Sequence, residues 1–69
     1  MMSFLKKSAN AAHFALRRAG YQQVLADEMP CGRFVAEYSL CHAGATVRTV
    51  VLHISPKGRV VSEKWFGAR

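Results

Sequence analysis

Residues 46–65, TVRTVVLHISPKGRVVSEKW, decide the fold of this chain. The first ten of them are rich in β-branched side chains, which favour strands. Pro56 and Gly58 occupy the second and fourth positions of a four-residue turn, where a type I turn with a glycine bulge needs them. The stretch therefore predicts a β-hairpin in which Thr46–Ser55 returns through the turn into a strand that begins at Arg59.

The length of this turn sets the register of the hairpin. It places Ile54 opposite Val60 and Thr49 opposite Trp65. Because Thr46–Ser55 carries apolar side chains at both its even and its odd positions, we expect this strand to lie in the middle of the sheet.

A second strand is predicted at residues 33–42, where apolar and polar side chains alternate. Its inward-facing residues would be Phe34, Ala36, Tyr38 and Leu40. A three-residue loop at 43–45 keeps these residues on one face with Val50 and Leu52, whereas a slip of one residue would turn them to solvent. A less regular strand is expected at Tyr21–Ala26, followed by a loop over Asp27–Gly32.

Residues 4–19 are predicted to form a helix. Ser3 is a candidate N-cap, and Arg17, Arg18 and Gly20 form a typical helix end, with cations in the last turn and a glycine after it. The predicted apolar face consists of Phe4, Leu5, Ala9, Ala12, Ala15, Leu16 and Ala19. The fold class is therefore α+β, with one N-terminal helix packed on a three- or four-stranded antiparallel β-meander, in a single small domain of residues 1–69.

Composition limits the function classes. The 69 residues include ten Lys and Arg against four Asp and Glu, which gives a net charge of +6. The longest uncharged run, Tyr38–Val47, is shorter than the about 20 apolar residues that cross a bilayer, so no membrane partner is predicted. The first residues lack the pattern of a secretory signal, and the predicted compartment is the cytoplasm.

Neither catalysis nor metal binding is expected. The four acids are spread over a loop and two strands, and the chain has no glycine-rich phosphate loop and no nucleophile motif. Cys41 and His42 are consecutive on a strand and point to opposite faces, so they cannot share a zinc site. A disulfide between Cys31 and Cys41 is not expected in the cytoplasm. The prediction is a binding protein that is not an enzyme and carries no cofactor.

The basic charge favours nucleic acid as the partner, through the phosphate backbone and with weak base specificity. The residues predicted to make these contacts lie on the helix and on the last hairpin: Lys6, Lys7, Asn10, Arg17, Arg18, Lys57 and Arg59. Lys64 and Arg69 would add further cations along the last hairpin and tail. The same charge also suits an acidic protein surface.

The alternative is a small protein-binding inhibitor or modulator of the phage or mobile-element type, which would occupy a partner's surface. One helix covers one face of the sheet, so the other face would carry an apolar cluster of Val35, Val47, Val51, Val61 and Trp65. Phe14 lies off the apolar face of the helix, beside cations. We predict Phe14, Val51 and Trp65 as the protein-interface residues, and a homodimer packed through the uncovered face is a third hypothesis. The competing interpretation is that Phe14 and Trp65 are ordinary core residues.

Overall fold

The hairpin that decides the fold is formed by β3 (Ala45–Ile54) and β4 (Val60–Gly67), which pair antiparallel. The computed structural model describes residues 3–67; Arg69 lies outside them. Ile54 stands opposite Val60, as predicted. The predicted pairing of Thr49 with Trp65 is wrong by one residue, because a β-bulge follows that first pair.

The bulge at Val61 reverses the faces of β4. Because Val61 is an extra residue, Trp65 lies opposite Val50 and Glu63 lies opposite Leu52. A one-residue offset moves each following side chain to the other side of a sheet. Trp65 and Glu63 therefore lie on the helix-covered face, and the other face takes three different side chains of β4, namely Ser62, Lys64 and Phe66.

The next strand, β2 (Phe34–His42), pairs with β3 in the predicted register, with Tyr38 opposite Val50. The predicted three-residue loop is wrong. The strands are joined by Ala43 and Gly44, both with positive φ, as a two-residue hairpin turn requires. Val47 is an extra residue between the pairs of Leu40 and Cys41, and this bulge restores the register that the shorter turn would have shifted.

The expected fourth strand is present as β1 (Gln22–Glu28), which pairs antiparallel with β2. It runs on through Asp27 and Glu28, which the sequence pattern assigned to a loop. Another bulge leaves Val24 unmatched in the pairing. The sheet order is β1-β2-β3-β4, a four-stranded meander with β1 and β4 at its edges.

The helix, α1 (Ala9–Arg18), starts five residues later than predicted, and its N-cap is Ser8, not Ser3. The Ser8 hydroxyl accepts a hydrogen bond from the Ala11 amide at 3.1 Å. Before it, the Lys6 amide donates to the Val60 carbonyl and the Val60 amide donates to the Lys7 carbonyl. Backbone that pairs with a strand cannot also be helical, and this pairing delays the helix.

The helix ends where the sequence predicted. Gly20 has a φ of 98° after the cap residue Ala19, and its amide donates to the Arg17 carbonyl. The Tyr21 amide donates to the Leu16 carbonyl. These two bonds form a Schellman motif, which favours glycine because of its left-handed conformation.

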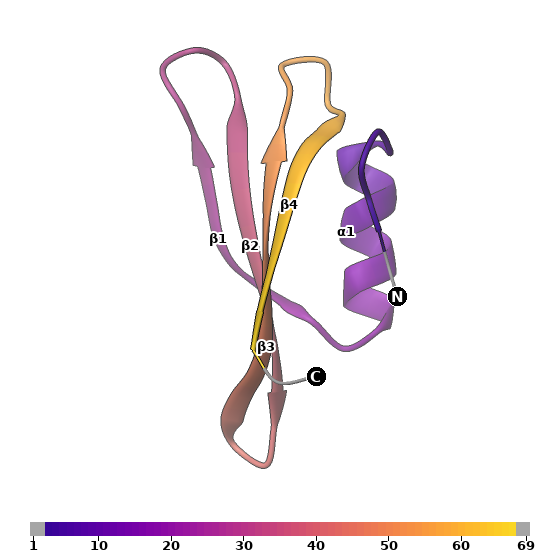
Figure 1. Cartoon of the computed structure of the whole chain (residues 1–69), viewed down its shortest axis with the longest axis vertical. Helices are drawn as coiled ribbons and strands as arrows, with labels where there is room; N and C mark the ends of the chain where they lie inside the picture. The colour runs from indigo at the N-terminus through magenta and orange to yellow at the C-terminus, as the bar shows by residue number, and fades with distance from the viewer. Residues whose placement is uncertain (1–2, 68–69) are drawn as a thin grey trace.

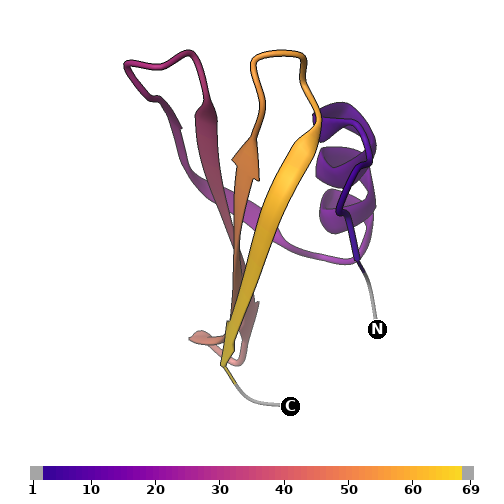
Figure 2. The same cartoon turned by 45° about the horizontal axis from the view of Figure 1, so that its top comes forward.

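The core lies between α1 and one face of the sheet. Figures 1 and 2 show α1 on the β4 side of the molecule, with the turn of the β1–β2 hairpin away from it. The helix contributes Ala12 and Leu16, and the remaining core residues come from the N-terminal segment and the strands: Phe4, Tyr21, Ala36, Tyr38, Val50, Leu52, Ile54 and Val60. Half-buried Trp65 packs against them, 6.3 Å from the Phe4 ring between centroids. Among the described residues, no helix is long and apolar enough to span a bilayer.

Candidate nucleic-acid interface

Four cations from two distant segments meet at one end of the molecule. The N-terminal segment brings Lys6 and Lys7 to the start of β4 through its backbone bonds with Val60. The β3–β4 turn brings Lys57 and Arg59, and the Arg59 guanidinium donates to the Lys6 carbonyl at 3.2 Å. All four side chains are exposed. We call this group of Lys6, Lys7, Lys57 and Arg59 the basic tip.

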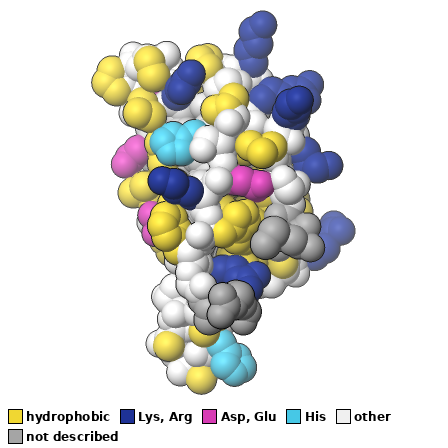
Figure 3. Space-filling model, viewed as in Figure 1, with side chains coloured by type: hydrophobic (Ala, Val, Ile, Leu, Met, Phe, Trp, Pro, Cys, Tyr) yellow, Lys and Arg dark blue, Asp and Glu magenta, His cyan; other side chains and the backbone are white. Residues whose placement is uncertain are grey.

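The basic tip surrounds the N-terminus of α1. The Ala9 amide donates to the Gly58 carbonyl at 2.7 Å, which joins the first residue of the helix to the β3–β4 turn. The first helical turn contains no acidic residue, and within residues 3–67 none of the four cations has a carboxylate partner. Figure 3 shows Lys and Arg side chains gathered at the upper right, where Figure 1 places the starts of α1 and β4. The positive end of the helix dipole adds to this field, so the surface attracts anions.

The other predicted nucleic-acid contacts do not form one stripe with the basic tip. Lys6 and Lys7 precede the helix, so the predicted helical arrangement of cations is wrong. Arg17 and Arg18 lie at the far end of the ten-residue helix, about 12–14 Å from Ala9 along its axis. The Arg17 guanidinium donates to the Tyr21 carbonyl at 3.4 Å. Asn10 is exposed in the first turn, closer to the basic tip than to either arginine.

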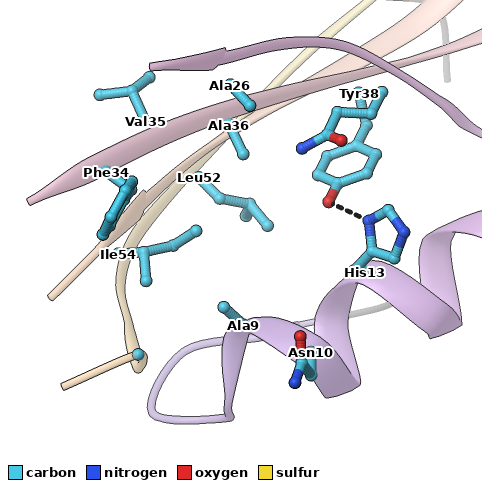
Figure 4. A pocket seen from close by; sticks show the side chains of 12 residues that line it. Ala9, Asn10, His13, Ala26, Phe34, Val35, Ala36, Tyr38, Leu52 and Ile54 are labelled. Carbon is cyan, nitrogen blue, oxygen red and sulfur yellow. Dashed lines mark hydrogen bonds between the residues drawn. The ribbon is translucent and has the colours of Figure 1, made fainter. Parts of the chain in front are cut away.

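Beside Asn10, a shallow groove opens between α1 and strands β1, β2 and β3 of the sheet. Its volume is about 390 Å³, and its lining is mostly apolar, with Ala36, Leu52 and Ile54 among the strand residues. Figure 4 shows His13 reaching from the helix to Tyr38. The His13 Nδ1 atom and the Tyr38 hydroxyl lie 2.6 Å apart in a hydrogen bond whose direction follows the imidazole tautomer.

This contact corrects the interpretation of His13, whereas Tyr38 faces the core as predicted. The sequence pattern placed His13 on the solvated face of the helix, but its side chain is part-buried against Tyr38. Burial raises the pKa of Tyr38 above its ordinary value, and the positive charge of Arg17 lowers that pKa in part. Neutral Tyr38 is therefore the stable form well into the alkaline range.

The three residues predicted as a protein interface lie on different surfaces. Phe14 is 65% exposed on α1, and its ring makes an edge contact with His13. Val51 is half-buried on the face of the sheet that α1 does not cover. Trp65 is on the covered face and packs edge-on against Tyr21. Trp65 therefore closes the helix–sheet core, and the predicted apolar cluster on the uncovered face loses its tryptophan.

Glu63 has a structural role that the sequence pattern does not predict. Its carboxylate accepts a hydrogen bond from the Ser3 hydroxyl at 2.7 Å and another from the Phe4 amide at 3.0 Å. Because the bulge at Val61 turns Glu63 to the helix-covered face, this acid anchors the N-terminal segment that carries Lys6 and Lys7. Local sequence gives no signal for a contact across about sixty residues.

Within residues 3–67, no three His, Cys, Asp or Glu side chains come close enough to hold a metal ion. Cys31 and Cys41 are exposed free thiols, and the Cys41 sulfur lies 3.7 Å from the Thr46 hydroxyl. Comparison with protein-family models, with curated proteins and with solved structures finds no significant match to the chain. The chemistry of its own surface therefore has to support any proposal about its function.

Proposed function

We propose that this chain is a small non-enzymatic protein that binds nucleic acid through the phosphate backbone, with the basic tip as its main contact. The observation that supports this is the convergence of four exposed cations from two distant segments around a helix N-terminus. Phosphate contacts of this kind dominate nucleic-acid affinity and carry no base information. Arg17, Arg18 and Asn10 are proposed as outlying contacts.

Two further observations agree with this function. The net charge is +6 over 69 residues, so the long-range field also favours polyanions. Cations beside a helix N-terminus oppose the helix dipole and cost about 0.3–1 kcal/mol each at exposed positions. Because these cations lower the stability of the free protein, an anionic ligand explains their position better than solubility alone does. We propose the cytoplasm as the compartment, where both exposed thiols stay reduced.

The test is a fluorescence-anisotropy titration with short duplex DNA, single-stranded DNA and RNA over a range of salt concentrations. Four duplex-phosphate contacts predict a slope of log affinity against log salt of about −3.6. The variant Lys7→Glu/Lys57→Glu changes two basic-tip residues whose side chains make no hydrogen bond or ion pair within residues 3–67. Its slope should fall to about half of that value, with an affinity loss on all sequences alike.

The matched control compares single changes: Lys64→Glu makes the same change in net charge as Lys57→Glu, but at an exposed position in β4 opposite Val51, away from the β3–β4 turn. The control should keep the wild-type slope. Equal losses in Lys57→Glu and Lys64→Glu would mean that net charge alone acts, and no binding by the wild type at low salt would exclude the proposal.

The second candidate function is a protein-binding modulator. The observation that favours it is the apolar groove next to α1, because the helix that forms one wall also exposes Phe14. Exposed aromatic side chains are frequent anchors in protein interfaces. If Phe14→Ser abolishes capture of a partner while Lys7→Glu/Lys57→Glu does not, this function replaces the first.

A further inference from the structure

The edge strand β1 is the most exposed regular element of the chain. It stands at the end of the sheet order, and each of its seven residues, Gln22–Glu28, is exposed. Among the described residues, β2 is the strand that pairs with it, so its outer side presents free backbone donors and acceptors. Such an edge is a template for pairing with a strand of another chain.

The two edge strands of this sheet differ in how well they are protected against pairing with another chain. The start of β4 is covered by the pairing of Lys6 and Lys7 with Val60, and β4 carries a lysine. In contrast, β1 reads QQVLADE and contains no lysine or proline, the residues that usually protect an edge. Its bulge leaves two consecutive apolar residues in solvent, with Val24 55% and Leu25 40% exposed.

The charges at the two ends of β1 are opposite. Arg17 and Arg18 lie just before the strand, and the Arg17 guanidinium is bonded to the Tyr21 carbonyl at its start. The strand ends in Asp27 and Glu28. Two such strands side by side in parallel would place like charges together, whereas an antiparallel pair places the acids of each beside the arginines of the other. The strand is therefore complementary to a second copy of itself in one orientation.

The exposed area agrees with a partner copy. The chain exposes 4954 Å², while a compact monomer of 7.7 kDa exposes about 4300 Å². The excess of about 600 Å² approaches the about 800 Å² that each partner buries in a stable interface. The small core also favours association, since domains of this size often gain stability by forming oligomers.

We propose that β1 pairs antiparallel with β1 of a second copy, so that two chains form one continuous eight-stranded sheet. The pairing is centred near Leu25 and brings Glu28 beside Gln22 of the second copy. A two-fold axis normal to the sheet relates the copies, so both helices lie on one face and the two basic tips lie at opposite ends of the dimer. This inference does not rest on nucleic-acid binding, because the basic tip is not part of the interface.

The test is sedimentation velocity of the wild-type chain and two matched variants in the micromolar range. The wild type should sediment at twice 7.7 kDa. Val24→Lys places a charge on the β1 edge and should raise the dimer dissociation constant at least about tenfold. Val61→Lys makes the same change at a valine that is 47% exposed on β4, and it should leave the dimer intact. A monomeric wild type, or a dimer lost in Val61→Lys but kept in Val24→Lys, overturns the proposal.

Charge exchange provides an independent second test. Asp27→Arg/Glu28→Arg should dissociate the dimer, because it places four cations at each junction. Adding Arg17→Asp/Arg18→Asp to the same chain should restore the dimer. If the combined variant keeps a native circular-dichroism spectrum but stays monomeric, the antiparallel β1 pairing is wrong.

Discussion

Replacing Glu63 with alanine should destabilise the fold by about 2–3 kcal/mol. The carboxylate holds two groups of the N-terminal segment, the Ser3 hydroxyl at 2.7 Å and the Phe4 amide at 3.0 Å. Hydrogen bonds to a charged group contribute about 1.5–3 kcal/mol each, so two bonds at the lower end give about 3 kcal/mol. Because Glu63 is only half-buried, solvent screening reduces this sum to about 2–3 kcal/mol. Phe4, 4% exposed and stacked on Trp65, is the core side chain that this anchor keeps in place.

This loss is large relative to the total unfolding free energy of the domain. A chain of 69 residues is expected to have an unfolding free energy of about 3–10 kcal/mol. A loss of 2–3 kcal/mol should lower Tm by roughly 10–20 °C in a domain of this size. Urea unfolding followed by Trp65 fluorescence measures the change directly, since Trp65 is the single tryptophan and lies against Phe4.

The matched control is Glu37→Ala. Glu37 is also half-buried on a strand, but it faces the other side of the sheet and makes no side-chain hydrogen bond within residues 3–67. Its replacement should cost at most about 0.5 kcal/mol. Equal effects of the two substitutions would refute the anchoring role of Glu63. Ser3→Ala combined with Glu63→Ala should cost less than the sum of the single changes, because both remove the same bond.

Two further outcomes follow from the fold. Because burial raises the Tyr38 pKa, the folded state favours the neutral phenol; stability should be fully present below about pH 10 and should fall as the pH rises above it. The Tyr38→Phe variant should lose about 1 kcal/mol of stability at neutral pH, because it lacks the hydrogen bond to His13. When unfolding is measured from pH 8 upward, its stability should fall less with pH than that of the wild type. Parallel stability curves of the two proteins would contradict this assignment. Gly67→Ala should lower Tm, because a Cβ at this position would lie 2.5 Å from the Val47 carbonyl oxygen and the φ of Gly67 is 109°. An unchanged Tm would show that the end of β4 moves away freely.

The fold class and the order of the elements could be predicted because local signals agreed with them. The turn at Pro56 and Gly58 gave the first pair of the β3–β4 hairpin, and the glycine at position 20 gave the end of the helix. Alternation of apolar residues in β2 gave the face that Tyr38 shares with Val50. In each case the information lies within a few residues of the feature that it predicts.

The errors have a common physical origin in β-bulges and long-range backbone pairing. A bulge adds one residue without a mark in the hydrophobic pattern, since Val61 and Val47 look like ordinary strand residues. Each bulge changes which residues share a face, and this is how Trp65 was assigned to the wrong side. The predicted start of the helix is wrong for the second reason. Lys6 and Lys7 are close to helical residues in the sequence, but their backbone pairs with Val60 of β4.

The same pairing that hid the start of the helix also creates the basic tip. If residues 4–8 were helical, the helix would extend about 7.5 Å beyond its present N-terminus, and Lys6 and Lys7 would lie on this extension without their bonds to the start of β4. Backbone hydrogen bonds to Val60 instead hold them beside Arg59, whose guanidinium donates a hydrogen bond to the Lys6 carbonyl. Bringing like charges together at the positive end of a helix opposes stability, so the bonds of Glu63 and Val60 work against that repulsion. An anion bound there would remove the conflict, and added phosphate or polyanion should therefore raise the Tm of the wild type more than that of Lys7→Glu/Lys57→Glu.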